Sequence, residues 1–581
     1  MNKIKILLSS LVVMSFFGCG LEKMASDYDK VVYQQSPTIL EVHGGKIVIN
    51  LKGSFPERYF AKKATVEITP VIINENGDEL KLKSIILQGE QATGGESTIF
   101  FESGGDFVYS DKIDYTNSML NSILELRALA TLEDDNKVLG PVTIAKGVIA
   151  TSMRIENDEV VAFADHGYKE VETVSETATI YFLVNKSNIR TTEKSDDDVK
   201  KLQEFIKLGY KTESFVVKSS ASPEGTEKIN TQLSDDRKNS TLKYAKYLLK
   251  KLRADGSSKD DNYKLSSAGA DWDGFNKLVE SSTIAEKSTI LSLSNRNKEK
   301  TQKERGELLQ DMAEVYDALE GDVLQYLRKS EITINSYLPK KTKEEIMNLA
   351  FIKWQLKTYS MMGEDSIDIN GNIVYGGYHY SINPEIRKLD VNEALYAASL
   401  ISSEDLVMDW VKLMDTIGVV FEDWRAYNNL AAHAMERGKI FGNAHAYENA
   451  YENLNKAREL GGDQPEILIN LGILASWNGD LNKAQKLFDQ ANTSNYNKAT
   501  LNLRMGDYRS ACRYYRGEET YNATLATILN GDNNSNCSEE TSACYYLNAI
   551  AGARLANESM LFVNLEKAIN SDSNYKIQAT K

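Results

Sequence analysis

One arginine in this sequence stands where it could bind a carboxylate. Arg237 follows Ser234, Asp235 and Asp236, which together make a favourable start for a helix. A guanidinium group beside a helix N-terminus can donate paired hydrogen bonds to a carboxylate. We therefore take Arg237 as the centre of a candidate carboxylate-binding site.

The residues around Arg237 predict a strand, a tight turn and a helix. Val216 and Val217 end an apolar run, and Pro223 with Gly225 supplies turn-forming residues. Apolar residues then recur at helical spacing and predict one buried helix face: Leu242, Ala245, Leu248, Leu249 and Leu252. An ordinary strand-turn-helix explains this periodicity equally well, so the case for a site depends on which residues occupy the turn.

The turn and helix resemble the signature of OmpA-like peptidoglycan-binding domains. In that family a turn with Asp and Gly is followed by Asn and then by Leu-Ser-x-x-Arg, and Gly225, Asn230 and Arg237 match here. The resemblance implies that Arg237 binds the diaminopimelate carboxylate of the cell-wall stem peptide, helped by Asn230 and the turn. Ser222 stands where the family has its Asp, and Glu224 two residues later could replace that carboxylate.

The same resemblance implies an α/β sandwich over residues 171–340. A first strand begins at Thr179, and Ser195 is expected to cap a helix that begins with three acidic residues. The final strand is expected at 330–337. An insertion at about 266–328 makes this module longer than the family's usual domain.

The first eighteen residues predict an export signal. Two lysines precede a short apolar core at Ile6–Phe17, which ends at a Gly-Cys junction. This junction resembles that of bacterial lipoproteins, in which cleavage leaves Cys19 as an acylated first residue; an ordinary signal peptide with a chance cysteine is the alternative. The resemblance implies that residues 19–30 form a lipid-anchored linker and that the protein faces the periplasm from the outer membrane.

Residues 31–170 contain short β-branched runs separated by turn residues. Alternation in ATVEITP and ELKLKS leaves one face of each strand in water, so an antiparallel β-sandwich is expected. Asn76-Gly77 predicts a hairpin between two of these runs. The run KGSFPERYFAKKATVEITPVI also resembles the front end of OmpA-fused lipoproteins of the Bacteroidetes.

From residue 341 to 581 the pattern is helical and self-similar. One unit has the spacing of a tetratricopeptide repeat (TPR): Leu471, Gly472, Ala475, Gly479, Ala484, Phe488 and Ala491. Three to four such repeats predict an α-helical solenoid whose groove binds partner proteins of the outer membrane or periplasm. Before the repeats, the Gly- and Tyr-rich stretch 361–382 predicts a loop or a hairpin with its turn at 368–371.

The remaining cysteines lie near the end of the chain. After Cys19 only Cys512, Cys537 and Cys544 occur. In an oxidising compartment Cys537 could pair with Cys544 across a short loop, or the thiols could stay free.

The sequence gives no sign of catalysis or of a cofactor. None of the five histidines lies in HExxH, and no nucleophile elbow, Walker loop or GxGxxG opens a helix. The net charge of −15 provides no basic surface for nucleic acid. We therefore predict a protein that is not an enzyme and that uses no metal and no cofactor.

Together these features predict a multidomain α+β lipoprotein that links the envelope. It would bind peptidoglycan through Arg237 and partner proteins through the repeats. The alternative keeps the fold and drops the ligand: a scaffold subunit of an outer-membrane complex for protein export, assembly or surface structures. Ser222 at the family's Asp position and the insertion favour this alternative.

Overall fold

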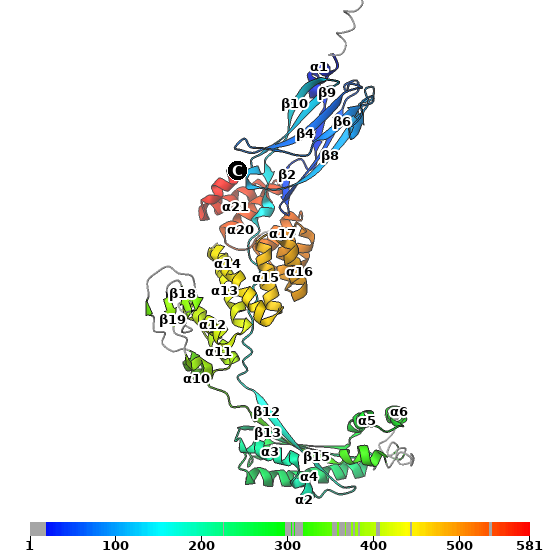
Figure 1. Ribbon diagram of the computed structural model, residues 1–581, viewed down its shortest axis with the longest axis vertical. Coiled ribbons are helices and arrows are strands. Elements are labelled where there is room, and N and C mark those ends of the chain that lie inside the picture. The colour runs from blue at the N-terminus through cyan, green and yellow to red at the C-terminus, as the bar shows by residue number, and fades with distance from the viewer. Residues whose placement is uncertain are drawn as a thin grey trace, which may run out of the picture. The chain divides into compact units, whose positions relative to one another are not determined.

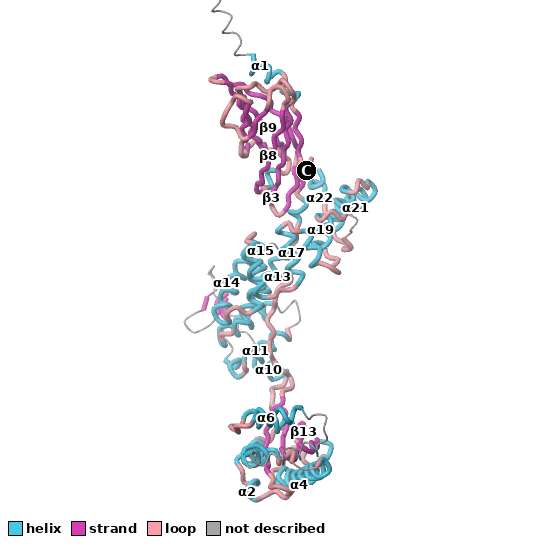
Figure 2. Tube along the Cα trace, turned by 90° about the vertical axis from the view of Figure 1, so that its right-hand side faces the viewer, coloured by secondary structure: helices cyan, strands magenta, loops and turns pink. Residues whose placement is uncertain are grey.

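The computed structural model has a mixed α+β fold, with a β-rich N-terminal region and a helical C-terminal region (Figures 1 and 2). It describes residues 19–224, 226–296, 318–350, 384–401, 407–441, 444–533 and 537–580, together with residues 304 and 307 and four short strands between 357 and 380. The predicted export signal, residues 1–18, lies outside the described residues. The chain divides into two compact units, of which the first joins residues up to 166 to residues 401–581.

The N-terminal region of the first unit contains two sheets. The strands of the first sheet have the order β1-β3-β2-β11, with β8 paired to β3, and those of the second have the order β10-β9-β4-β6-β7, with β5 paired to β4. The first sheet comprises β1 (Val32–Gln35), β2 (Leu40–His43), β3 (Lys46–Phe55), β8 (Gly105–Asp114) and β11 (Val148–Ile149). The second comprises β4 (Thr65–Ile73), β5 (Glu79–Lys81), β6 (Ile85–Gly89), β7 (Ser97–Ile99), β9 (Ile123–Leu132) and β10 (Asp135–Lys146).

The two sheets share one hydrophobic core because their strands alternate apolar and polar residues. Ile47 and Ile49 of β3 are buried in the same cluster as Val66 and Ile68 of β4. This is the period-two pattern of a strand with one face in water. The predicted hairpin at Asn76-Gly77 is confirmed: it joins β4 to β5, which pair antiparallel.

Residues 19–30, expected to form a lipid-anchored linker, are helical and packed, which a linker would not be. Cys19–Ser26 forms helix α1, and Tyr28–Lys30 forms a short 3₁₀ helix. Leu21, Met24 and Tyr28 are buried in the core of the two sheets. Three apolar side chains at helical spacing hold the start of the described chain against the β-rich region.

The second unit, residues 167–356 with 383–400, is built on a four-stranded sheet. The strand order is β12-β15-β13-β14, with β13 and β14 parallel and the other neighbours antiparallel. Helices α3 and α4 contribute buried apolar residues to the core of this sheet. The elements are β12 (Thr173–Tyr181), α2 (Thr191–Lys194), α3 (Asp197–Lys207), β13 (Thr212–Ala221), α4 (Glu227–Lys251), β14 (Tyr263–Ala270) and β15 (Lys329–Tyr337).

Both helix starts in this unit differ from the prediction. Helix α4 begins seven residues before Ser234, with Thr226 as its N-cap and the Ile229 N–H donating to the Thr226 hydroxyl at 3.4 Å. Helix α3 is capped by Asp196 and not by Ser195. Near each helix start, several residues carry a side-chain oxygen that could cap the helix. The sequence pattern alone did not identify which of them is the N-cap.

The predicted insertion also begins later than expected. Residue 266 lies within β14, so the inserted elements start after Ala270. Their described part has its own small core around Phe275 and Val323, and residues 297–317 lie mostly outside the described chain. The elements are α5 (Trp272–Ser281), α6 (Lys287–Arg296), the π-helix η5 (Glu320–Leu324) and α9 (Gln325–Leu327).

The helices that directly follow residue 341 belong to the second unit and not to the helical region of the first. Helices α10 (Lys343–Ala350) and α11 (Val391–Ser399) pack together. Lys341 forms an ion pair with Glu393 of α11 at 2.8 Å. The boundary predicted at residue 341 is therefore too early.

The helical region of the first unit consists mostly of consecutive helix pairs. Helices α13 and α14, α15 and α16, α17 and α18, and α20 and α21 pack against each other. Their bounds are α12 (Val407–Phe421), α13 (Trp424–Phe441), α14 (Ala444–Gly461), α15 (Pro465–Trp477), α16 (Leu481–Ala491), α17 (Asn495–Met505), α18 (Tyr508–Tyr514), α19 (Tyr521–Leu529), α20 (Ser542–Arg554), α21 (Glu558–Ser571) and α22 (Asn574–Thr580).

One of these pairs shows why small residues recur in the helices. A Cβ atom added to Gly472 of α15 would lie 2.5 Å from the ring of Phe488 on α16. The buried Phe488 ring therefore occupies the space that a side chain at residue 472 would need.

Of the two alternatives for the cysteines, the pairing of Cys537 with Cys544 is present, and Cys512 is free. Among the residues described between 357 and 380, strands β17 (Ser366–Ile367) and β18 (Ile373–Tyr375) pair antiparallel. They flank the predicted turn at 368–371, which lies outside the described residues. In the described part of the chain no helix combines the length and the apolar character needed to cross a membrane.

Candidate functional site

The predicted carboxylate receptor, Arg237, is fully buried. It lies on α4, and its Nε donates to the Lys186 carbonyl at 3.0 Å. The two Nη atoms donate to the carbonyls of Ser220 at 3.0 Å and Leu183 at 3.3 Å. The guanidinium also lies over the ring of Phe182, 5.2 Å from its centroid. The side chain therefore ties α4 to the end of β13 and to the chain that follows β12.

This environment still keeps Arg237 charged at neutral pH. Burial lowers its pKa to about 10; the neighbouring Arg328 cation adds to this effect, and Glu224 opposes it. The three backbone carbonyls supply the acceptors that water would otherwise provide. Because none of the residue's surface is exposed, a carboxylate from outside cannot reach the guanidinium in this arrangement.

A second arginine, which the sequence analysis did not single out, lies between the other predicted site residues. Arg328 is 3% exposed, and its Nε donates to the Ser222 hydroxyl at 3.1 Å. Its Nη2 donates to Glu224 at 2.9 Å, and its Nη1 donates to Glu320 at 2.7 Å. The structure therefore brings Ser222 and Glu224 together around Arg328.

The remaining two predicted site residues have different outcomes. Asn230 lies on α4 with 3% of its surface exposed. It precedes Arg237 by seven positions, about two helical turns, so both residues lie on the buried face of α4. Gly225 lies outside the described residues.

A cavity of about 300 Å³ opens next to Arg328. Arg190 and Glu193, which form an ion pair, lie on its wall together with Glu320 and Arg328. The cavity also has an aromatic and aliphatic side, formed by Tyr181, Phe182, Leu183, Val184 and Tyr326. Its lining combines both signs of charge with apolar surface.

The helical region contains a second candidate site that the sequence analysis missed. Residues 155–165, here called the bound segment, follow the β-rich region and contain neither helix nor strand. Side chains on four helices bind the backbone of this segment. We call these four the asparagine ladder: Asn429 on α13, Asn470 on α15, Asn497 on α17 and Asn522 on α19. The β-sandwich was expected to extend to residue 170. This boundary is wrong, because residues 155–165 form no strand and bind to the helices.

Each asparagine of the ladder binds both the N–H and the C=O of a single residue in the bound segment. The Glu156 N–H donates to Asn522 at 3.0 Å, and the same amide donates to the Glu156 carbonyl at 2.9 Å. Asn497 binds Val160 in this way, with distances of 2.8 and 2.9 Å.

The other two asparagines repeat the arrangement further along the segment. Asn470 binds Ala162 with two distances of 2.8 Å. Asn429 binds Ala164 with distances of 2.7 and 3.1 Å. Three of the four bound residues are two positions apart, which is the period of an extended chain. The helices therefore hydrogen-bond to the backbone of the segment much as a neighbouring β-strand would.

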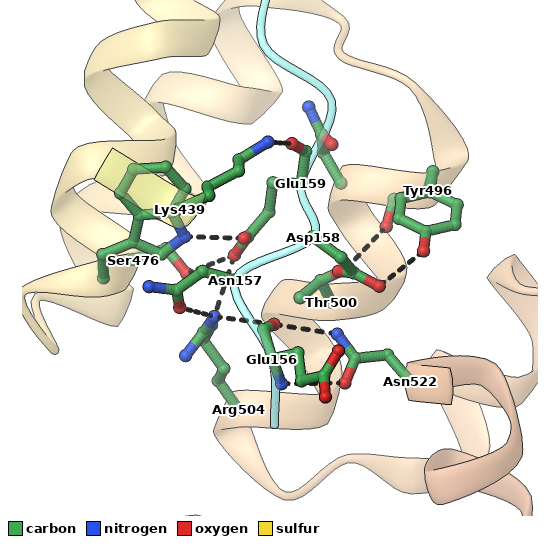
Figure 3. A network of polar contacts seen from close by, with 12 residues as sticks. Glu156, Asn157, Asp158, Glu159, Lys439, Ser476, Tyr496, Thr500, Arg504 and Asn522 are labelled. Carbon is green, nitrogen blue, oxygen red and sulfur yellow. Dashed lines mark hydrogen bonds and ion pairs between the residues drawn. The ribbon is translucent and has the colours of Figure 1, made fainter. Parts of the chain in front are cut away.

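The side chains of Asp158 and Glu159 also accept hydrogen bonds from the helices (Figure 3). Glu159 is fully buried and accepts the indole N–H of Trp477 at 2.6 Å and the Nε–H of Arg504 at 3.2 Å. Lys439 donates to the Glu159 backbone carbonyl. One carboxylate is thus matched by a cation and by a neutral donor inside the protein.

Asp158 lies on the other side of the segment, where Tyr496 and Thr500 donate to its carboxylate at 2.5 and 3.3 Å. Burial raises the pKa of Asp158; the hydrogen bond from Tyr496 opposes this, and the charge of Glu159 adds to it. Burial also raises the pKa of Glu156, and Asp158 contributes to that shift. Three acidic residues thus lie close together in this segment, with Glu159 buried, Asp158 partly buried and Glu156 exposed.

A signal for the asparagine ladder was present in the sequence. Asn429, Asn470, Asn497 and Asn522 each precede a glycine by nine positions, at Gly438, Gly479, Gly506 and Gly531. A polar residue that recurs in one register of a helical repeat marks the same place on each helix. On α20, Asn548 binds the N–H and C=O of Cys537 in the same manner, at 2.8 and 3.0 Å.

Among the described residues, no group of His, Cys, Asp and Glu side chains is arranged to hold a metal ion. His433 lies against the ring of Trp410, and burial lowers its pKa. No protein-family model and no curated protein sequence matches this chain.

Proposed function

We propose that this protein is a scaffold of the bacterial outer membrane that has kept an OmpA-like fold without using it to bind peptidoglycan. Acylation at Cys19 would anchor it to the membrane, with the body of the protein in the periplasm. The repeats would hold partner proteins of an export, assembly or surface-structure complex. It would act by binding and not by catalysis.

The observation that carries the proposal is the environment of Arg237. The family's use of this arginine requires free guanidinium donors at the surface of the domain. Here three backbone carbonyls accept from Arg237, and none of its surface is exposed. An arginine with these contacts supports the fold of its own domain and leaves a ligand carboxylate without its receptor.

The contacts of Arg328 support the proposal independently. In the family the turn carboxylate receives the ammonium group of the ligand. Here the cation between Ser222 and Glu224 is a side chain of the protein itself. Breaking a buried ion pair from one side costs about 3–5 kcal/mol, so an external ammonium would have to compensate for that loss.

The proposal also includes the type of fold that each region has. The two sheets with one core suit a β-sandwich, and the β12-β15-β13-β14 sheet with its helices suits an OmpA-like domain. The consecutive helix pairs suit a TPR-like solenoid.

Peptidoglycan binding remains the second candidate because of the cavity beside Arg328. Arg190 and Arg328 could face a carboxylate there, and Glu193 and Glu320 could face an ammonium group. Diaminopimelate carries both kinds of charge.

A pull-down on purified sacculi separates the two candidates. The mature, unlipidated protein should stay in the supernatant, and so should the variants Arg237→Ala and Arg190→Ala. Arg190 is 40% exposed, so its replacement tests the cavity with little effect on folding, and the exposed Arg253→Ala provides a matched control. Retention of the wild type and of Arg253→Ala, with loss of Arg190→Ala, would make wall binding the function.

A further inference from the structure

We infer that the asparagine ladder is a receptor for an extended acidic segment of a partner protein, and that residues 155–165 fill this receptor in cis. The inference deepens the proposed scaffold function, because it gives the chemistry of the partner that the helical region would take.

The asparagine ladder binds backbone N–H and C=O groups and not a particular series of side chains. Eight hydrogen bonds join the four amides to the N–H and C=O groups of Glu156, Val160, Ala162 and Ala164. Every extended peptide presents the same groups at the same two-residue spacing. Any extended chain in this place would have its backbone groups satisfied by the same four amides.

Two positions that bind carboxylates add selectivity for acidic side chains to the backbone contacts. Arg504 and Trp477 bind the Glu159 carboxylate, and Tyr496 binds that of Asp158. An adjacent Asp-Glu pair would therefore set the register of an incoming segment. The receptor requires that acidic pair, with an extended backbone on both sides of it.

The second residue after the acidic pair adds an apolar contact. Val161 is buried with Leu471 and Ala431 in the core shared by the helix pairs, whereas Val160 on the opposite side is 56% exposed. The helical region thus provides a small apolar pocket beside the acid-binding positions. The preferred partner sequence has Asp-Glu, then any residue, then a small aliphatic residue.

Because residues 155–165 already fill the receptor, they determine how tightly a partner segment must bind to displace them. A covalently attached segment acts at an effective concentration on the order of millimolar. A partner segment of equal intrinsic affinity would compete poorly at ordinary protein concentrations. Weakening the internal copy should therefore expose the receptor.

The test uses the full mature chain and a fluorescent peptide with the sequence of residues 154–166. In the variant Glu159→Lys, the internal segment meets Arg504 and Lys439 with a like charge and loses its main anchor. Peptide binding, measured by fluorescence anisotropy, should be at least tenfold tighter than to the wild type. The double variant Glu159→Lys with Asn470→Ala should lose this gain, and a peptide with Lys in place of the Glu159 equivalent should bind neither protein.

A second variant guards against misfolding of Glu159→Lys. Replacing residues 155–165 by a glycine-serine chain of equal length removes the internal ligand and introduces no new charge. If this variant keeps the helical circular dichroism of the wild type and binds no peptide, the segment is a structural tether and the inference is wrong. Failure to bind sacculi leaves this result unaffected, so the two proposals can fail separately.

A separate measurement distinguishes a partner protein from a second copy of this chain. Sedimentation of the wild-type mature chain, whose segment keeps Glu159, should show a monomer at micromolar concentration. A dimer that disappears on Asn470→Ala would identify the occupant as another copy's segment and would overturn the assignment to a different protein.

Discussion

The Glu159 carboxylate lies 2.6 Å from the indole nitrogen of Trp477, and none of the Glu159 residue is exposed. The two residues are 318 positions apart in the chain, so this contact joins the segment after the β-rich region to the middle of the helical region. Arg504 completes the environment of the carboxylate at 3.2 Å. The positions of the bound segment and of the helices are thus mutually dependent.

Replacing Glu159 should destabilise the helical region strongly. Glu159→Ala leaves Arg504 and the Trp477 N–H without this acceptor, and we expect a loss of about 3–5 kcal/mol in the free energy of unfolding. Glu159→Gln keeps the shape and one acceptor and should lose less, about 1–3 kcal/mol. Urea denaturation followed by circular dichroism measures both values. The exposed Glu57→Ala is the control, and an equal small effect for all three variants would rule out this role for Glu159.

Removing one asparagine of the ladder should loosen the segment locally. Asn470→Ala deletes the acceptor of the Ala162 N–H and one of the two donors to its C=O, the other being Asn428, at a cost of about 1–3 kcal/mol. Hydrogen exchange at the Ala162 amide should accelerate at least tenfold. The exposed Asn482→Ala on α16 should leave that exchange rate unchanged. Unaltered protection of Ala162 in Asn470→Ala would mean that the hydrogen bonds described here are not formed in solution.

The β-rich region shows how much of the fold the sequence pattern predicts. Alternation in β3 and β4 placed one face of each strand in the core, and Asn76-Gly77 located a hairpin, because both signals are local. The spacing of Gly472 and Phe488 likewise anticipated the close packing of a helix pair. Pairing of Cys537 with Cys544 remained one of two alternatives.

The sites were much less predictable because their contacts are distant in sequence. Arg328 lies 104 positions from Glu224, and its role depends on how the chain between them folds. The ladder could have been noticed as Asn nine positions before Gly, but asparagine is common on protein surfaces and gave no hint of a ligand. That the ligand is residues 155–165 of the same chain required the three-dimensional fold.

Arg237 should matter for the stability of its own unit. Arg237→Ala leaves the carbonyls of Lys186, Ser220 and Leu183 without this donor, so we expect a loss of about 3 kcal/mol or more. Arg237→Lys restores the charge but supplies fewer directed donors, and it should recover only part of the loss. Denaturation of the mature chain, monitored by hydrogen exchange in β13, measures the effect. If Arg237→Ala is as stable as the exposed Arg253→Ala, the structural role assigned to Arg237 is wrong.

The bound segment should be held more firmly at mildly acidic pH than at neutral pH. The folded-state pKa values of Glu156 and Asp158 are both raised, so protonation favours the folded form. The stabilisation is present below the unfolded pKa values and is lost as the pH rises through the folded ones. Protection of the Ala162 amide, corrected for the intrinsic exchange rate, should increase from about pH 7 to about pH 5.

The control for this pH dependence is the double variant Glu156→Gln with Asp158→Asn. It should keep the protection of the Ala162 amide nearly constant over the same range. A wild-type segment that loosens on acidification would contradict the roles assigned to Glu156 and Asp158.

The most direct test of the scaffold proposal is calorimetric titration of the mature protein with a soluble muropeptide that carries diaminopimelate. We predict no saturable binding up to millimolar muropeptide, because the donors of Arg237 are already bonded and Glu224 already accepts from Arg328. Saturable binding that is lost in a folded Arg237→Lys variant would contradict it and would restore this arginine to the wall-binding role of the OmpA-like family.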